Sequence, residues 1–158
     1  ALTIMIGGRE DIFEGVRPLL DCYAQRAVLM GPAGSGQLTK MVNQICIAGL
    51  VEALAEGLDF ARRVGLDGEK AVGVLSGGAA QSWQMDNRAL TMLEGKFDFG
   101  FAVEWMRKDL KIALEEAKRN GAMLDMAQLV DGYYAEVQEL GGNRWDTSSL
   151  IKRLRAMG

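Results

Sequence analysis

One long segment that can form a single helix limits what this chain can fold into. From Ser35 to Val64 there is no proline, glycines are scattered, and apolar residues recur at helical spacing. This pattern predicts one continuous helix with Ser35 as its N-cap. A helix of about thirty residues spans roughly 45 Å. Because so long an apolar helix exposes more surface than a small domain can cover, we expect the chain to form a dimer or tetramer.

A glycine-rich turn leads into this helix. Gly31, Gly34 and Gly36 allow positive backbone dihedrals and the close approach of a ligand or another backbone, while Pro32 stiffens the start of the turn. The turn is therefore predicted to be a hinge or the wall of a ligand site. It is also where the sequence supports a domain boundary, between residues 1–30 and 31–158.

Lys40, Asn43 and Gln44 form a polar group near the start of the long helix. Their spacing of three and four residues projects them from one side of it, and the next turns are apolar on nearly every side. Lys40 is therefore a candidate for proton transfer. In the alternative interpretation, Lys40 extends to water and the two amides cap neighbouring groups. The local sequence leaves both open.

The composition removes several classes of function. The chain has no histidine, which excludes histidine bases, serine–histidine triads and nearly every zinc or iron site built on imidazole. We expect no metal. A net charge of -3 with both signs interleaved gives no basic surface for nucleic acid. No uninterrupted apolar run approaches the roughly 20 residues of a membrane helix, so we expect no membrane partner.

Two carboxylates and two cysteines have ordinary interpretations. Glu52 and Glu56 are four residues apart and could form half of a metal site or an acid pair. Without histidine or a second such pair, we predict that they pair with arginines or cap a contact between helices. Cys22 and Cys46 have apolar neighbours in predicted helices. They are predicted to be reduced, buried thiols of a cytoplasmic protein.

The order of predicted elements indicates a mainly α protein. Residues 2–6 and 27–30 are predicted strands, and residues 9–24 a helix that Pro18 breaks or restarts. This β-α-β unit lacks the GxGxxG spacing of a nucleotide fingerprint. No further strand is predicted after residue 35. The predicted helices there are 35–64, 67–75, 79–93, 102–119, 123–140 and 147–156.

Two ordered motifs give the chain a resemblance to a known family. They are Gly31-x-x-Gly34-x-Gly36-x-x-x-Lys40-x-x-Asn43 and Lys108-Asp109-Leu110 followed by Ala113. The chain resembles the β-hydroxyacid dehydrogenases, the family of 3-hydroxyisobutyrate dehydrogenase and tartronate semialdehyde reductase. The resemblance implies that residues 1–30 end a dinucleotide-binding domain and that residues 31–158 are an all-helical catalytic and oligomerisation domain, similar to the C-terminal domain of 6-phosphogluconate dehydrogenase. Such a C-terminal half is expected to be inactive alone.

The resemblance implies a role for the polar group on the long helix. Lys40 corresponds to the general acid/base for hydride transfer between NAD or NADP and a small hydroxy acid, or its oxo acid or semialdehyde. Asn43 and Gln44 would bind substrate. Many members carry two asparagines after the lysine, so which amide contacts substrate in this chain stays open.

The resemblance also implies roles for four residues further along. Trp83 and Phe101 resemble positions that line the substrate pocket, although both also suit core aromatics at helical spacing. Lys108 would lie beside the cofactor, with Asp109 at the pocket. Because neighbours on a helix point roughly 100° apart, we expect Lys108 and Asp109 to be more than an ion pair. The alternative is a solvated charged stretch.

The sequence leaves two functions open. The first is the catalytic half of a nicotinamide-dependent β-hydroxyacid dehydrogenase, with hydroxyisobutyrate, tartronate semialdehyde, glyoxylate and succinic semialdehyde all suitable as substrates. The second is a non-catalytic helical assembly or binding module that retains the family scaffold.

Overall fold

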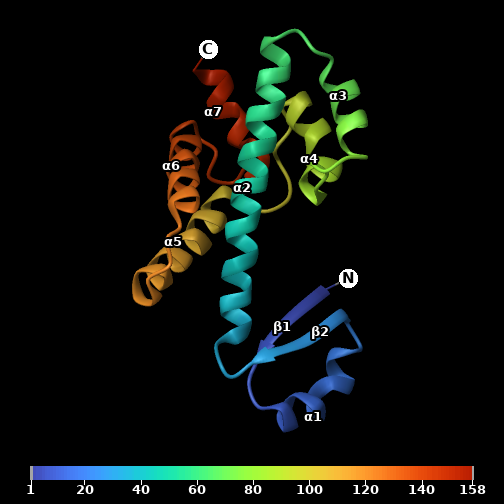
Figure 1. Ribbon diagram of the computed structural model, residues 1–158, viewed down its shortest axis with the longest axis vertical. Coiled ribbons are helices and arrows are strands. Elements are labelled where there is room, and N and C mark those ends of the chain that lie inside the picture. The colour runs from blue at the N-terminus through green and yellow to red at the C-terminus, as the bar shows by residue number, and fades with distance from the viewer. Residues whose placement is uncertain (1, 158) are drawn as a thin grey trace. The chain divides into compact units, whose positions relative to one another are not determined.

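The computed structural model describes residues 2–157 and divides into two compact units (Figure 1). The first unit is Ala1–Gln44, and the second, called the helical unit below, is Ile45–Gly158. The division falls inside helix α2 (Ser35–Arg63), which contributes residues to both units. Because a change of packing partners within a continuous helix does not locate a linker, the predicted domain boundary between residues 30 and 31 stays a prediction.

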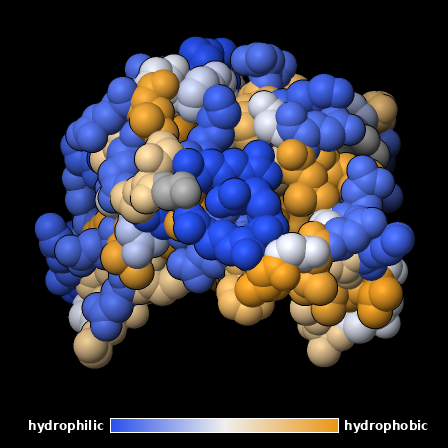
Figure 2. Space-filling model, turned by 90° about the horizontal axis from the view of Figure 1, so that it is seen from above, coloured by the Kyte–Doolittle hydropathy of each residue, from blue (hydrophilic) through white to orange (hydrophobic). Residues whose placement is uncertain are grey.

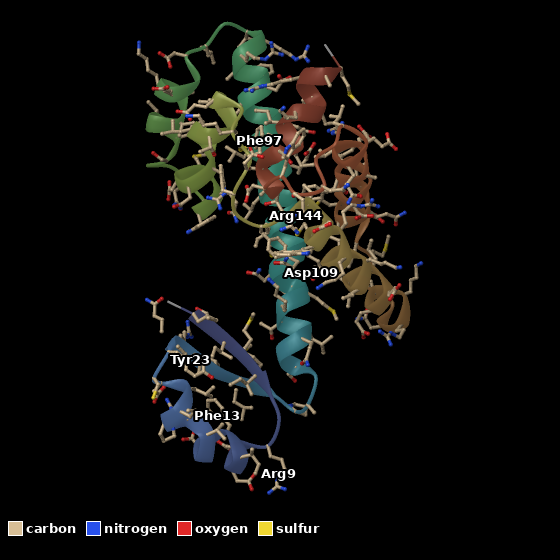
Figure 3. All side chains as sticks on the ribbon, turned by 180° about the vertical axis from the view of Figure 1, so that it is seen from behind. Arg9, Phe13, Tyr23, Phe97, Asp109 and Arg144 are labelled. Atoms are coloured by element: carbon tan, nitrogen blue, oxygen red, sulfur yellow. The ribbon has the colours of Figure 1, made fainter. Side chains whose placement is uncertain are left out.

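A two-stranded parallel sheet and its crossover helix make up most of the first unit. Strands β1 (Leu2–Gly7) and β2 (Ala24–Gly31) are joined by α1 (Glu10–Leu20), whose buried Phe13 lies between the helix and the strands (Figure 3). The predicted β-α-β unit is confirmed. Helix α1 continues through Pro18 and ends two residues later. Pro18 lies in the last turn, and the hydrogen bond that its missing N–H would have made is lost only there. The register pairs Ile4 with Ala27, Met5 with Val28 and Ile6 with Leu29.

The glycine-rich turn brings the start of α2 against strand β1. A Cβ at Gly36 would overlap the carbonyl oxygen of Met5, so only glycine allows this approach. The close neighbour is thus the chain's own backbone. Ser35 is the first residue of α2 rather than the predicted N-cap, because the Leu38 N–H already bonds to the Gly34 carbonyl.

Helices form the rest of the described chain, as predicted. Helix α4 starts four residues later than expected, because the Ser82 hydroxyl accepts a hydrogen bond from the Met85 N–H and caps it there. The Asp67 side chain caps α3 in the same way. The elements are α3 (Gly68–Leu75), α4 (Trp83–Glu94), α5 (Val103–Asn120), α6 (Asp125–Glu139), the 3-10 helix η1 (Thr147–Ser149) and α7 (Leu150–Ala156).

The core of the helical unit forms around the second half of α2. Ala48, Val51 and Ala55 are buried there, and Phe97 lies among the helices (Figure 3). The surface seen from above is largely hydrophilic with separate apolar patches (Figure 2). By length and composition α2 could also cross a membrane. In this structure, however, the second half of α2 contributes buried residues to the core and packs as a central helix of the bundle.

Buried carboxylates on α2 are paired with arginines. Glu52 accepts a hydrogen bond from Arg153 Nη2 at 2.8 Å, which confirms the predicted arginine partner. Burial raises the pKa of Glu52, although Arg153 opposes this effect. Asp59 accepts from Arg63 Nε at 2.6 Å and from Arg62, and the Arg63 hydrogen bond lowers the pKa of Asp59 most. Among the described residues, no cluster of three His, Cys, Asp or Glu side chains could hold a metal.

The interpretation of the cysteines was partly wrong. Cys22 and Cys46 are free thiols, as expected, but both are exposed. Apolar neighbours in sequence did not predict burial, because Cys22 lies in the turn after α1, and on helix α2 the neighbours of Cys46 point to other faces.

Candidate active site

The polar group on α2 is held together by one amide oxygen. Lys40 Nζ donates to Gln44 Oε1 at 3.0 Å, and Asn43 Nδ2 donates to the same atom at 2.8 Å. Gln44 is only 2% exposed, whereas Lys40 and Asn43 are exposed. The helical spacing thus gathers the three side chains, with the buried amide beneath the amine. An amide oxygen can orient an amine without taking its proton.

The two aromatic candidates lie in the helical unit. Trp83 is the first residue of α4, and its side chain is 58% exposed, so the interpretation as a core aromatic is wrong for it. Phe101 is half-buried before α5 and packs edge-on against Trp105, with ring centres 5.9 Å apart. Trp83 therefore exposes part of its indole to solvent, where an apolar group could contact it.

Asp146 connects the regions of both aromatics. Its carboxylate is buried and accepts from Arg88 Nε and from the Phe101 N–H, each at 3.0 Å. The Arg88 guanidinium lies 4.9 Å from the Trp83 ring centre. Asp146 also caps η1, because its side chain accepts a hydrogen bond from the Ser148 N–H. The contacts to Arg88 and Phe101 had no local signal, because they join residues 58 and 45 positions apart.

Lys108 and Asp109 form an ion pair on α5. The Lys108 Nζ lies 3.4 Å from Asp109 Oδ1, so adjacent side chains meet despite their different directions on the helix. Whether they are more than an ion pair stays a prediction. The lysine side chain is 66% exposed and the aspartate side chain only 15%. The neighbouring Arg107 pairs with Asp131 on α6. The charged amine of Lys108 therefore lies at the surface, next to the partly buried Asp109 carboxylate.

Charges of both signs surround Lys108. A groove of about 500 Å³ along α5 and α6 contains the cations Arg107, Lys108, Lys111 and Lys118 together with acidic residues. Neither the glycine fingerprint nor more than two strands of a nucleotide-binding sheet is present in the described residues.

Comparisons with known proteins agree on one family. A family model described as "NAD-binding of NADP-dependent 3-hydroxyisobutyrate dehydrogenase" matches residues 34–154. An uncharacterized oxidoreductase of Shewanella frigidimarina is 62% identical over 154 residues, which are 98% of this chain and 53% of that protein. The 2-hydroxy-3-oxopropionate reductase of Escherichia coli is 34% identical over 156 residues, 99% of this chain and 53% of that protein.

A solved structure extends the similarity to the fold. The Mycobacterium tuberculosis 3-hydroxyisobutyrate dehydrogenase with L-serine has a TM-score of 0.90 and 26% identity, covering 98% of this chain and 55% of that one. The chain therefore spans about half the length of the relatives that it matches.

Proposed function

Because this chain belongs to the 3-hydroxyisobutyrate dehydrogenase family, we propose that it is the helical, substrate-binding half of an enzyme that transfers a hydride reversibly between NAD or NADP and a small hydroxy acid. The oxidised partner would be the corresponding oxo acid or semialdehyde. The relatives are about twice as long, so the proposal concerns the full-length protein, and this chain alone is expected to be inactive.

Lys40 carries the proton in this proposal. The observation that supports it most is the exposed amine held by the buried Gln44 oxygen. In the reducing direction, the Lys40 ammonium donates a proton to the oxygen that becomes the substrate hydroxyl. In the oxidising direction, the neutral Lys40 amine takes the hydroxyl proton. When bound, NAD or NADP supplies or accepts the hydride.

The two amides have different roles in this proposal. The Gln44 oxygen accepts from both Lys40 and Asn43, and its side chain is buried, so Gln44 is proposed to position the amine. Asn43 is exposed and is proposed to bind the hydroxyl or carboxylate of the substrate. In this proposal, Asn43 rather than Gln44 contacts the substrate, a choice that the sequence left open.

The helical unit supplies the remaining roles. Trp83 and Phe101 are proposed to contact the carbon skeleton of the substrate, because an aromatic face binds a short apolar chain without competing for its polar groups. Lys108, braced by Asp109, is proposed to contact a phosphate of NAD or NADP. In this proposal, each polar candidate residue on α2 and α5 has a chemical role that suits its side chain.

The exposed apolar side chains support a proposal of self-association. Phe60 is 64% exposed and Leu66 58%, both near the end of α2. Apolar side chains that are exposed together on one surface mark protein interaction sites. Light scattering of the full-length protein should show a dimer or tetramer. A monomer would contradict this proposal.

Turnover by the full-length protein tests the proposed function. Hydroxyisobutyrate, tartronate semialdehyde, glyoxylate and succinic semialdehyde would each be supplied with NAD or NADP in the appropriate redox state, and nicotinamide absorbance followed. We expect at least one combination to be turned over, with loss of activity in Lys40→Ala. A folded protein that binds a cofactor but turns over none of these substrates would favour the non-catalytic helical module.

A further inference from the structure

The loop that carries Phe101 is bound along its length to the segment before η1. Asp146 N–H donates to the Phe97 carbonyl at 2.8 Å, and Thr147 N–H donates to the Phe101 carbonyl at 3.0 Å. The N–H of Phe101 donates in turn to Asp146 Oδ2 at 3.0 Å. Both polar backbone groups of Phe101 are therefore fixed by two consecutive residues. The backbone of Phe101, from which the ring projects, cannot shift without breaking these bonds.

Asp146 is built to hold that loop rather than merely to cap a short helix. The residue is 1% exposed, and Oδ1 accepts from Arg88 Nε at 3.0 Å, from Ser148 Oγ at 2.6 Å and from the Ser148 N–H at 3.1 Å. With the bond from Phe101, the buried carboxylate has four donors, which satisfies a charge that would otherwise be costly to bury.

Gly100 makes room for the carboxylate. Its φ of +72° is a conformation that side chains with a Cβ rarely adopt, and a Cβ there would overlap Asp146 Oδ2. Any other residue would push the carboxylate away from the Phe101 N–H. The loop sequence is thus matched to the position of Asp146.

Arg88 carries the influence of Asp146 to the exposed indole. Its guanidinium carbon lies 4.9 Å from the Trp83 ring centre and 5.1 Å from the Phe99 ring centre. A planar guanidinium stacks on aromatic faces, and its Nε bond to Asp146 fixes its plane. An exposed tryptophan would otherwise sample several rotamers. Arg88 therefore restrains the orientation of Trp83.

We infer that Asp146 and Arg88 form a positioning pair that fixes Phe101 and Trp83 in the arrangement that receives the substrate's carbon skeleton. Asp146 acts on Phe101 directly through the backbone N–H, and on Trp83 through Arg88. The pair contributes to substrate selection without touching the reacting atoms. This inference rests on the proposed function, which gives Trp83 and Phe101 a substrate to contact.

Two substitutions in the full-length protein separate the two arms of the pair. Asp146→Asn keeps the volume of the side chain but replaces one accepting oxygen by an amide NH₂, which then faces hydrogen-bond donors. We expect the Phe101 amide to exchange its hydrogen at least about tenfold faster, and the KM for the hydroxy acid to rise about tenfold with kcat nearly unchanged. Arg88→Lys keeps a cation near Asp146 but removes the planar stack. It should raise the same KM while the Phe101 amide stays protected.

Arg153→Lys is the matched control. It alters another buried arginine–carboxylate pair, the one between Arg153 and Glu52. We expect it to lower stability while leaving both the KM for the hydroxy acid and the exchange of the Phe101 amide unchanged. This control separates a local effect on the loop from general destabilisation.

Three results would overturn the inference. They are unchanged exchange of the Phe101 amide in Asp146→Asn, unchanged KM in Arg88→Lys, or an equal rise of KM in Arg153→Lys. If Asp146→Asn does not fold, the KM of Arg88→Lys decides. If the wild-type protein turns over no hydroxy acid, the proposed function fails by itself. The claim that Asp146 holds Phe101 is then decided by amide exchange alone.

Discussion

The two groups of candidate site residues are held in place in different ways. Gln44 accepts hydrogen bonds from Lys40, four residues away, and from the adjacent Asn43, all on a single helix. Trp83 and Phe101 depend on Asp146, which lies 45 residues beyond Phe101 and 58 beyond Arg88. The first arrangement requires only that α2 is helical, whereas the second requires the tertiary fold of the helical unit. Destabilising the helical unit should therefore impair substrate selection before it impairs proton transfer.

The largest expected effect is on the local group. Lys40→Ala in the full-length enzyme should lower turnover by about 10² to 10⁴, the usual contribution of a positioned acid/base. Cofactor affinity should stay the same. Lys108→Ala is the matched lysine control, and it should weaken cofactor binding with a smaller effect on kcat. A fall of less than about tenfold in Lys40→Ala, with cofactor binding intact, would remove Lys40 from the mechanism.

A change at Gly100 tests the long-range group. Gly100→Ala should lower the unfolding free energy by about 3 kcal/mol or more, because its Cβ displaces the buried Asp146 carboxylate. Gly121→Ala is the control, since Gly121 also has a positive φ but open space around a Cβ. It should cost only about 1 kcal/mol, the strain of that conformation. Equal losses in urea unfolding would show that Asp146 does not hold this loop.

The buried amide of the local group should control kcat rather than KM. Gln44→Met keeps the length of the side chain but removes the oxygen that receives Lys40. We expect kcat to fall about tenfold with the KM for the hydroxy acid little changed, because the amine loses its orientation. Asn43→Ala should show the opposite pattern. If the two variants behave alike in steady-state kinetics, the proposed division between the amides is wrong.

Two carboxylates, one paired locally and one paired at long range, should make the stability of the protein depend on pH. Asp59 is paired locally with Arg62 and Arg63, and its lowered pKa means that its contribution is present above about pH 4 and lost as pH falls through its folded pKa. Glu52 is paired over 101 positions with Arg153, and burial raises its pKa. Its contribution is present below about pH 4 and lost as pH rises through its folded pKa.

Two variants separate these effects. Asp59→Asn should reduce the loss of stability on the acid side, and Glu52→Gln should reduce the loss on the less acid side. Urea unfolding from about pH 3 to pH 7 measures both. Loss of the acid-side dependence in Glu52→Gln would reverse the assignment.

Local and long-range contacts also differ in how far they could be predicted from the sequence. The long helix, the β-α-β unit and the gathering of Lys40 with Gln44 follow from helical and strand spacing, which act within a few residues. The bond between Asp146 and Phe101 could not be predicted, because it depends on how two distant segments pack. The exposure of Trp83 was missed for the same reason, since helical spacing shows which residues share a face but not what covers it.

The most direct test of the central claim is chemical rescue of Lys40→Ala. The substitution leaves space where the amine stood, and a small primary amine such as methylamine can supply the missing proton carrier. If Lys40 transfers the proton, turnover of the variant should rise with methylamine concentration, and the wild-type enzyme should not respond. Turnover that does not depend on methylamine, in a variant that is folded and binds cofactor, would contradict a proton-transfer role for Lys40.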